Sequence, residues 1–142
     1  MSQENVEIVR RAVELFNESG VTGPGLNLLF TEDAEFHEPP EQPAPRIARG
    51  REEVRMLMDE FDSAWEEHRS EPKEIRAVGI DKVLLISVEH FKGRDGIELE
   101  APHAAIFTLR DRKIVRWESF WDRRRALKAV GLPEQDAPTD SP

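Results

Sequence analysis

Two stretches of the chain carry apolar residues at helical spacing, one near the start and one before the middle. The first stripe consists of Val6, Val9, Val13 and Phe16. The second consists of Val54, Leu57, Met58, Phe61 and Trp65. With Gly20 as a stop after the first and Pro72 as the outer limit of the second, the pattern predicts helices over 3–19 and 51–68. A short helix is expected over 26–30.

The rest of the chain alternates apolar and polar residues, which is typical of strands. Strands are predicted over 34–38, 73–79, 83–91, 97–109 and 113–121. The links between the last four are too short for parallel crossovers, so we expect antiparallel pairs. Asp122 is placed to cap a last helix over 123–130, which Gly131 ends.

Helices followed by a meander of strands predict an α+β fold, with the helices packed on one face of a curved antiparallel sheet. The length of 142 residues fits one domain, expected over 1–132. The acidic, apolar-poor segment 133–142 is expected to be a disordered tail. Apolar Ile106 and Phe120 fall on the outer face of the sheet and suggest a homodimer contact.

Composition narrows the function classes. The net charge of −9 disfavours nucleic acid and anionic membranes as partners. The chain has no cysteine, so disulfides and thiolate metal sites are excluded. The charged N-terminus does not resemble a signal peptide, and no apolar run is long enough to span a bilayer. We therefore expect a soluble, cytoplasmic protein.

One face of the predicted sheet looks like the wall of a pocket. Alternation places His103 among apolar residues of strand 97–109, on the same side as Phe107. Pairing with the next strand would add Trp117, Ser119 and Trp121 to this face. A histidine on an apolar wall serves as an acid, a base or a hydrogen-bond donor near neutral pH. The alternative is a buried histidine that is simply paired with a neighbouring polar group.

The strand over 83–91 is apolar on both sides, so its register stays open. With a five-residue turn after it, Glu89 and Ser87 share the face of His103. With a turn one residue shorter, His90 takes that place instead.

Three segments give the chain a family resemblance. They are LFTEDAEFHEPP at 29–40, Arg49-Gly50-Arg51-Glu52, and FTLRDRKIVRWESFWDRRRALKAVGL at 107–132. In these the chain resembles the SnoaL-like, polyketide cyclase-like group of the nuclear transport factor two-like superfamily. The resemblance implies a cone-shaped curved sheet around a hydrophobic pocket, and a homodimer. It also implies a cyclase or isomerase that needs no cofactor.

The resemblance also implies site residues. Glu38 matches the proton-shuttling carboxylate of similar isomerases, and its apolar surroundings would raise its pKa. Asp122 matches an aspartate implicated in acid/base work, although the helix cap is the favoured interpretation. Phe36 is expected to bind substrate, together with Phe107, Trp117, Ser119 and Trp121. His37 is expected to point away from Glu38.

The chain also departs from those isomerases. The position of their oxyanion-binding acid holds Ala105, their helix-one tyrosine falls at Ala12, and the sequence contains no tyrosine. A metal site is not expected, because the histidines would converge only if two undetermined strand registers favoured it.

Two functions therefore remain open. The first is an enzyme in which His103 and Glu38 exchange protons with a small apolar carbonyl compound. The second is a non-catalytic protein that binds a small apolar molecule or serves as a dimeric interaction module.

Overall fold

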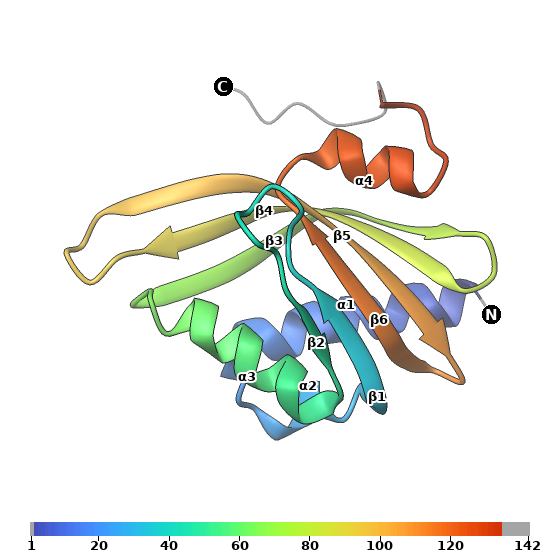
Figure 1. Cartoon of the computed structure of the whole chain (residues 1–142), viewed down its shortest axis with the longest axis horizontal. Helices are drawn as coiled ribbons and strands as arrows, with labels where there is room; N and C mark the ends of the chain where they lie inside the picture. Colours follow the sequence, from blue (N-terminus) through green and yellow to red (C-terminus); the bar gives the residue numbers. More distant parts are fainter. Residues whose placement is uncertain (1, 135–142) are drawn as a thin grey trace.

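The computed structural model describes residues 2–134, which form helices on both sides of one six-stranded sheet (Figure 1). The elements in chain order are α1 (Ser2–Ser19), α2 (Pro24–Asn27), β1 (Phe30–His37), β2 (Ile47–Arg49), α3 (Arg51–Asp62), β3 (Glu67–Val78), β4 (Lys82–Lys92), β5 (Glu98–Arg110), β6 (Lys113–Phe120) and α4 (Arg123–Ala129). The predicted α+β fold is confirmed. The predicted tail lies outside the described residues from position 135 onward.

The sheet runs in the order β2-β1-β6-β5-β4-β3. Strands β3 to β6 form the predicted antiparallel meander. The sheet is nevertheless mixed rather than antiparallel throughout, because β1 pairs with β6 in parallel. This pairing is possible because the long chain segment between β1 and β6 supplies the crossover that parallel strands need.

The helices lie on opposite faces of the sheet. In Figure 1, α1 and α3 lie beneath the sheet and α4 lies above it. The larger core cluster fills the lower side, and Asn17 of α1 forms two hydrogen bonds with the backbone of Ser70 in β3. Between these helices and the sheet lies the site described below.

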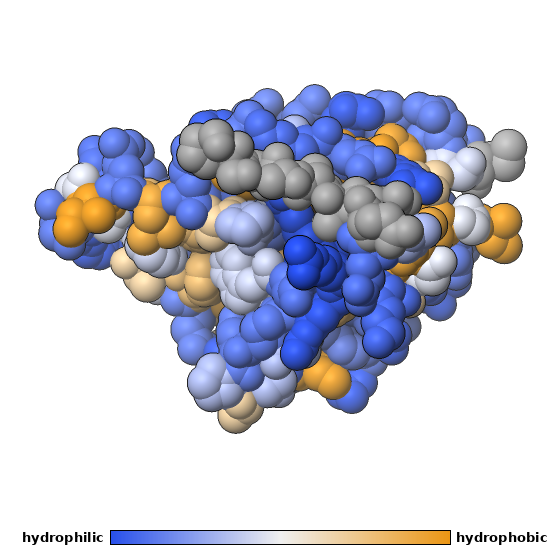
Figure 2. Space-filling view, turned by 90° about the horizontal axis from the view of Figure 1, so that it is seen from above, coloured by the Kyte–Doolittle hydropathy of each residue, from blue (hydrophilic) through white to orange (hydrophobic). Residues whose placement is uncertain are grey.

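The outer face of the sheet is covered by the chain itself. Ile106 and Phe120 pack against Ala126 and Leu127 of α4 and are buried. The expectation that these two residues leave apolar surface for a dimer contact is therefore wrong. Seen from this side, the surface is mainly hydrophilic, with apolar residues showing at both ends of the molecule (Figure 2). A homodimer stays a prediction that rests on the family resemblance.

The second long helix is shorter than predicted. It ends at Asp62, and the chain enters β3 at Glu67 rather than continuing as a helix to 68. The backbone N–H of Glu66 already donates to Lys92 of β4 at 2.8 Å. Pairing with a distant strand therefore overrides the local helical pattern. Pro72 lies inside β3, which tolerates it because β3 is an edge strand with a register shift there.

Smaller differences occur near the two ends of the chain. The short helix begins at Pro24, and Phe30 already belongs to β1, which is longer than predicted. The short strand β2 was not predicted. The cap at Asp122 is present, since its carboxylate accepts a hydrogen bond from the backbone N–H of Arg124 at 2.9 Å.

Candidate functional site

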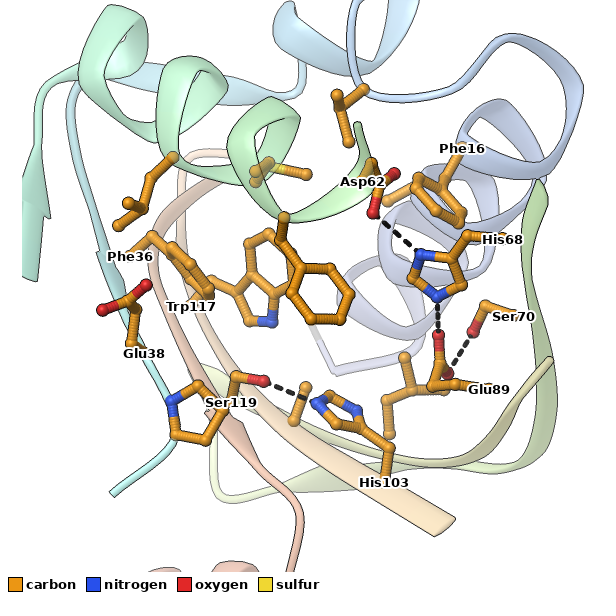
Figure 3. Close-up of a pocket in the computed structure, with 18 of the residues that line it drawn as sticks. Phe16, Phe36, Glu38, Asp62, His68, Ser70, Glu89, His103, Trp117 and Ser119 are labelled. Atoms are coloured by element: carbon orange, nitrogen blue, oxygen red, sulfur yellow. Dashed lines mark hydrogen bonds and ion pairs between the residues drawn. The ribbon is translucent and has the colours of Figure 1, made fainter. Parts of the chain in front are cut away.

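A cavity of about 140 Å³ opens between the concave face of the sheet and helices α1 and α3 (Figure 3). Seven of the eight residues predicted for the site line it: Phe36, Glu38, His103, Phe107, Trp117, Ser119 and Trp121. Asp122 does not line the cavity, and its carboxylate is occupied by the helix cap. The volume is similar to that of a cavity known to admit one benzene ring.

Strand register explains why these residues meet. Every second residue of a strand faces the same side. Ser119 of β6 lies opposite Ala105 of β5, and Phe107 lies opposite Trp117. In the next pair, His103 of β5 lies opposite Ser87 of β4.

His103 is buried and paired. Its Nε2 forms a hydrogen bond of 2.5 Å with Ser119 Oγ, and its ring contacts Trp121 edge to face at 4.9 Å. Its Nδ1 makes no hydrogen bond with any residue that the structure describes. Burial lowers the pKa of His103 from 6.5 to about 4, although the negative charge of Glu89 opposes this shift. The imidazole is therefore neutral near pH 7.

A charged network forms the other polar wall of the cavity. His68 Nδ1 lies 2.8 Å from Asp62 Oδ1, and His68 Nε2 lies 2.7 Å from Glu89 Oε1. The hydroxyls of Ser70 and Ser87 both donate to Glu89 Oε2, at 2.8 and 2.6 Å. Figure 3 shows this network across the pocket from Glu38.

The network fixes the charges of its members. Burial lowers the pKa of His68, but hydrogen bonds with Asp62 and Glu89 outweigh burial and raise it to about 9. Burial is the largest single effect on Glu89 and raises its pKa, but the hydrogen bonds with His68 and Ser87 and the attraction to His103 and His68 together outweigh burial and hold the pKa below its usual value. At neutral pH the cavity therefore holds a protonated His68, an ionised Glu89 and a neutral His103.

The sequence pattern predicts Glu89 on the face of His103 only for one of two possible turn lengths, and it does not predict His68 as a site residue. The register places Glu89 and Ser87 on the face of His103, as the longer-turn alternative required, and His90 on the other face. His90 binds Glu71 and Glu100 there, at 2.8 and 3.3 Å. His68 escaped notice because it fell inside the predicted helix, although His68 and Ser70 alternate as strand residues do.

Glu38 lines the cavity but differs from its expected state. Arg46 donates to its carboxylate through Nε at 3.0 Å and through a terminal nitrogen at 2.9 Å. The hydrogen bonds with Arg46 hold the pKa of Glu38 below its usual value. The expected rise in the pKa of Glu38 is therefore wrong, because the proline-rich loop brings the guanidinium of Arg46 beside this carboxylate. His37 does not line the cavity and instead lies 3.0 Å from Glu35.

Trp117 carries an unpaired polar atom. Its Nε1 is buried and has no hydrogen-bond partner among the described residues. The ring is stacked on Phe107 with centroids 5.7 Å apart and contacts Phe36 at 4.3 Å. A buried donor without a partner costs about 1–3 kcal/mol.

The two buried histidines predict a maximum of stability near pH 6.5. Unfolded His103 takes up a proton that folded His103 does not bind, so the free energy of unfolding decreases as pH falls from 6.5 towards about 4. Folded His68 keeps a proton that unfolded His68 releases, so the free energy of unfolding also decreases as pH rises from 6.5 towards about 9. Each shift corresponds to roughly 3 kcal/mol. Urea denaturation across this range measures the free energy of unfolding.

A variant separates the two contributions. His103→Gln should flatten the acidic side of the profile while the alkaline side persists, and His90→Gln on the outer face should preserve both. A profile with an unchanged acidic side in His103→Gln would contradict the assignment to His103.

Among residues 2–134, no group of three or more His, Asp or Glu side chains is arranged to hold a metal ion. Within the same residues, every helix is too short or too polar to cross a membrane. The arrangement suits proton transfer to and from a small apolar molecule.

Comparison with known proteins identifies relatives of this fold. The family model described as the SnoaL-like domain matches residues 9–117. No curated protein matches the sequence.

Three solved structures illustrate the likeness. An NTF2-like protein of unknown function from Burkholderia pseudomallei K96243 is 16% identical, with a TM-score of 0.73, over 91% of this chain and 98% of its own. TerC, co-crystallised with polyporic acid, is 17% identical, with a TM-score of 0.72, over 89% and 98%. A protein assigned as a polyketide cyclase from Xanthomonas campestris pv. campestris is 18% identical, with a TM-score of 0.67, over 92% and 98%. At these identities the likeness shows the fold alone.

Proposed function

The chain belongs to the SnoaL-like family, and on that premise we propose that its pocket isomerises or cyclises a small, largely apolar carbonyl compound by acid/base chemistry. The observation that carries the proposal is a buried, neutral His103 on an apolar wall, beside an ionised Glu89. The chemistry needs no cofactor, because the proton moves between the substrate and side chains of this chain.

The chemical step follows from the hydrogen bonds of His103. When Nε2–H donates to Ser119 Oγ, Nδ1 carries a lone pair and has no partner among the described residues. Nδ1 removes a proton from a carbon next to the carbonyl, and the C–H electrons form an enolate. The imidazolium then returns the proton to another carbon of the enolate. Alternatively, the enolate carbon attacks a second carbonyl and closes a ring, and the alkoxide formed from that carbonyl takes the proton from the imidazolium.

Glu89 supports the charged intermediate. Its negative charge raises the pKa of His103 and so stabilises the imidazolium that forms in this step. The hydrogen bonds from His68, Ser70 and Ser87 hold the carboxylate in place. We assign to Glu89 an electrostatic role beside His103. The proton-shuttling role that the resemblance implies for Glu38 is not part of the proposal, because Arg46 already neutralises Glu38.

The substrate class follows from the lining and from two relatives. Aromatic rings dominate the wall, and the cavity volume of about 140 Å³ suits a single ring or the end of a longer molecule. Polyporic acid in TerC and the assignment of the Xanthomonas protein as a polyketide cyclase support a ring compound with oxygen substituents.

Exchange of protons next to a carbonyl tests the proposal directly. Cyclohexanone in D₂O, followed by proton NMR, should exchange its α-protons faster with the protein than in buffer alone. The rate should saturate with ketone concentration and rise through about pH 4, as His103 becomes neutral. Saturable binding without any exchange would contradict the enzymatic proposal.

Non-catalytic binding of a small apolar molecule is the second candidate. The specific observation that favours it is that both carboxylates in question, Glu38 and Glu89, are held by cationic partners. This candidate predicts binding of cyclohexanone with no exchange above the buffer rate.

A further inference from the structure

We infer that the indole N–H of Trp117 is the hydrogen-bond donor that holds the carbonyl oxygen of the ligand in this pocket. The inference rests on the proposed function for the carbonyl class of ligand. It goes beyond that function by naming a ligand-binding residue and a specificity: ring ketones over hydrocarbons of the same shape. It also supplies a side-chain donor, which Ala105 and Ala12 do not.

The first support is the unpaired nitrogen itself. Among the described residues, three side-chain atoms that are themselves sealed from solvent have no hydrogen-bond partner: Thr31 Oγ1, Trp65 Nε1 and Trp117 Nε1. Of these three residues, only Trp117 lines the cavity. An indole N–H is a donor only, so its missing partner is an acceptor such as a carbonyl oxygen.

The second support is the fixed orientation of the ring. Trp117 is stacked on Phe107 at an interplanar angle of 13° and contacts Phe36 and Phe30 at 4.3 and 6.4 Å. Rings packed from several sides leave the donor little freedom to turn towards another acceptor. In Figure 3 the nitrogen of Trp117 faces the interior of the pocket.

The third support is the position of Trp117 relative to His103. Trp117 and Ser119 lie two residues apart on one face of β6, about 7 Å between Cα atoms. Ser119 is bound to His103, so a ring between the two walls would hold its carbonyl at Trp117 and an adjacent C–H near the imidazole. The small side chain of Ala105, opposite Ser119, leaves room there.

The donor would act most strongly on the enolate. Negative charge grows on the carbonyl oxygen as the proton leaves, and a donor fixed beforehand stabilises this charge. The nitrogen is sealed from solvent, so an incoming oxygen must displace neighbouring side chains by a rotamer-scale change, as is common on binding.

Binding of two compounds of equal shape tests the inference. Cyclohexanone carries an acceptor oxygen, and methylenecyclohexane replaces that oxygen by CH₂. The wild-type protein should bind the ketone about 3- to 10-fold more tightly than the alkene, the range of one neutral hydrogen bond. Trp117→Phe should remove this preference. Trp65→Phe is the matched control, because its unpaired indole lies outside the cavity, and it should retain the preference.

A second measurement needs no folded variant of Trp117. In ¹H–¹⁵N NMR spectra, the Trp117 indole proton should move downfield with cyclohexanone and far less with methylenecyclohexane, while the Trp65 signal stays in place. Equal affinity for both compounds, an unmoved Trp117 signal, or no binding of either compound overturns the inference.

Measurement of α-proton exchange distinguishes failure of the Trp117 donor from failure of the proposed enzymatic function. A ketone-specific shift of Trp117 without α-proton exchange supports the donor and contradicts the enzyme. Exchange that persists at the wild-type rate in Trp117→Phe, with the ketone preference unchanged, supports the enzyme and overturns the donor.

Discussion

Replacing His103 with alanine should lower the rate of α-proton exchange on cyclohexanone by about 10²–10⁴-fold, the usual contribution of a positioned acid or base. The reason is that, among the titratable groups lining the described cavity, the carboxylates of Glu38, Asp62 and Glu89 are each bound by a cationic partner. None of the three offers an unoccupied base in place of Nδ1. Proton NMR in D₂O at pH 7 measures the rate, with circular dichroism to verify folding.

A matched control is available on the opposite face of the same sheet. His90 lies in β4, binds Glu71 and Glu100 and does not line the cavity. His90→Ala should therefore exchange protons at the wild-type rate. If His103→Ala also stayed within about twofold of wild type while folded, the assignment of the base would be wrong.

Replacing Glu89 with leucine should destabilise the protein by about 3–5 kcal/mol, because it removes one partner of a buried ion pair. His68 would keep only Asp62, and the hydroxyls of Ser70 and Ser87 would lose their shared acceptor. Urea denaturation at pH 7 measures the loss. The double variant His68→Leu with Glu89→Leu should be less destabilised than the sum of the single variants, since no uncompensated charge remains.

Another histidine–glutamate pair across the same two strands is the control. Glu71 of β3 and His90 of β4 lie 2.8 Å apart on the outer face, with 39% and 24% of their side chains exposed. Glu71→Leu should cost less than about 1 kcal/mol, as exposed pairs do. Equal losses at Glu71 and Glu89 would contradict the role of burial.

The part of the site found from the sequence lies on strands with clear alternation. His103 and Trp117 each lie on a strand whose own apolar alternation assigns its side chains to a face. The short turn between the two strands does not assign them, because the register shifts between Thr108 and Leu109.

The sequence pattern predicts a helix at His68 because the apolar stripe continues past Asp62. The segment is a strand because its backbone pairs with β4. Such a pairing depends on a distant partner, and the alternation of His68 and Ser70 is a weak sign of it in the local pattern.

The charges of the site were the least predictable feature. The state of Glu38 depends on Arg46, which the proline-rich loop brings back beside it. The outer apolar residues Ile106 and Phe120 indicated a partner surface, yet α4 covers them. The pattern predicts which type of side chain lies at each of these positions. It does not predict which residue lies beside it, because the path of the backbone after a loop brings Arg46 to Glu38 and α4 to the outer face.

The proline in β3 has a consequence for how the molecule meets other copies of itself. An open sheet has two free edges, and unpaired edge strands are templates for aggregation through strand addition. One edge, β2, is only 3 residues long, whereas β3 is 12 residues long. Pro72 removes one backbone N–H donor from β3, and the strand is irregular at the register shift that follows. Charged side chains lie in the strand both before and after Pro72. These charged residues are Glu67, Arg69, Glu71, Lys73, Glu74 and Arg76. These features protect the edge strand β3 against the addition of strands from other molecules. The sheet can therefore remain open around its pocket without closing into a barrel.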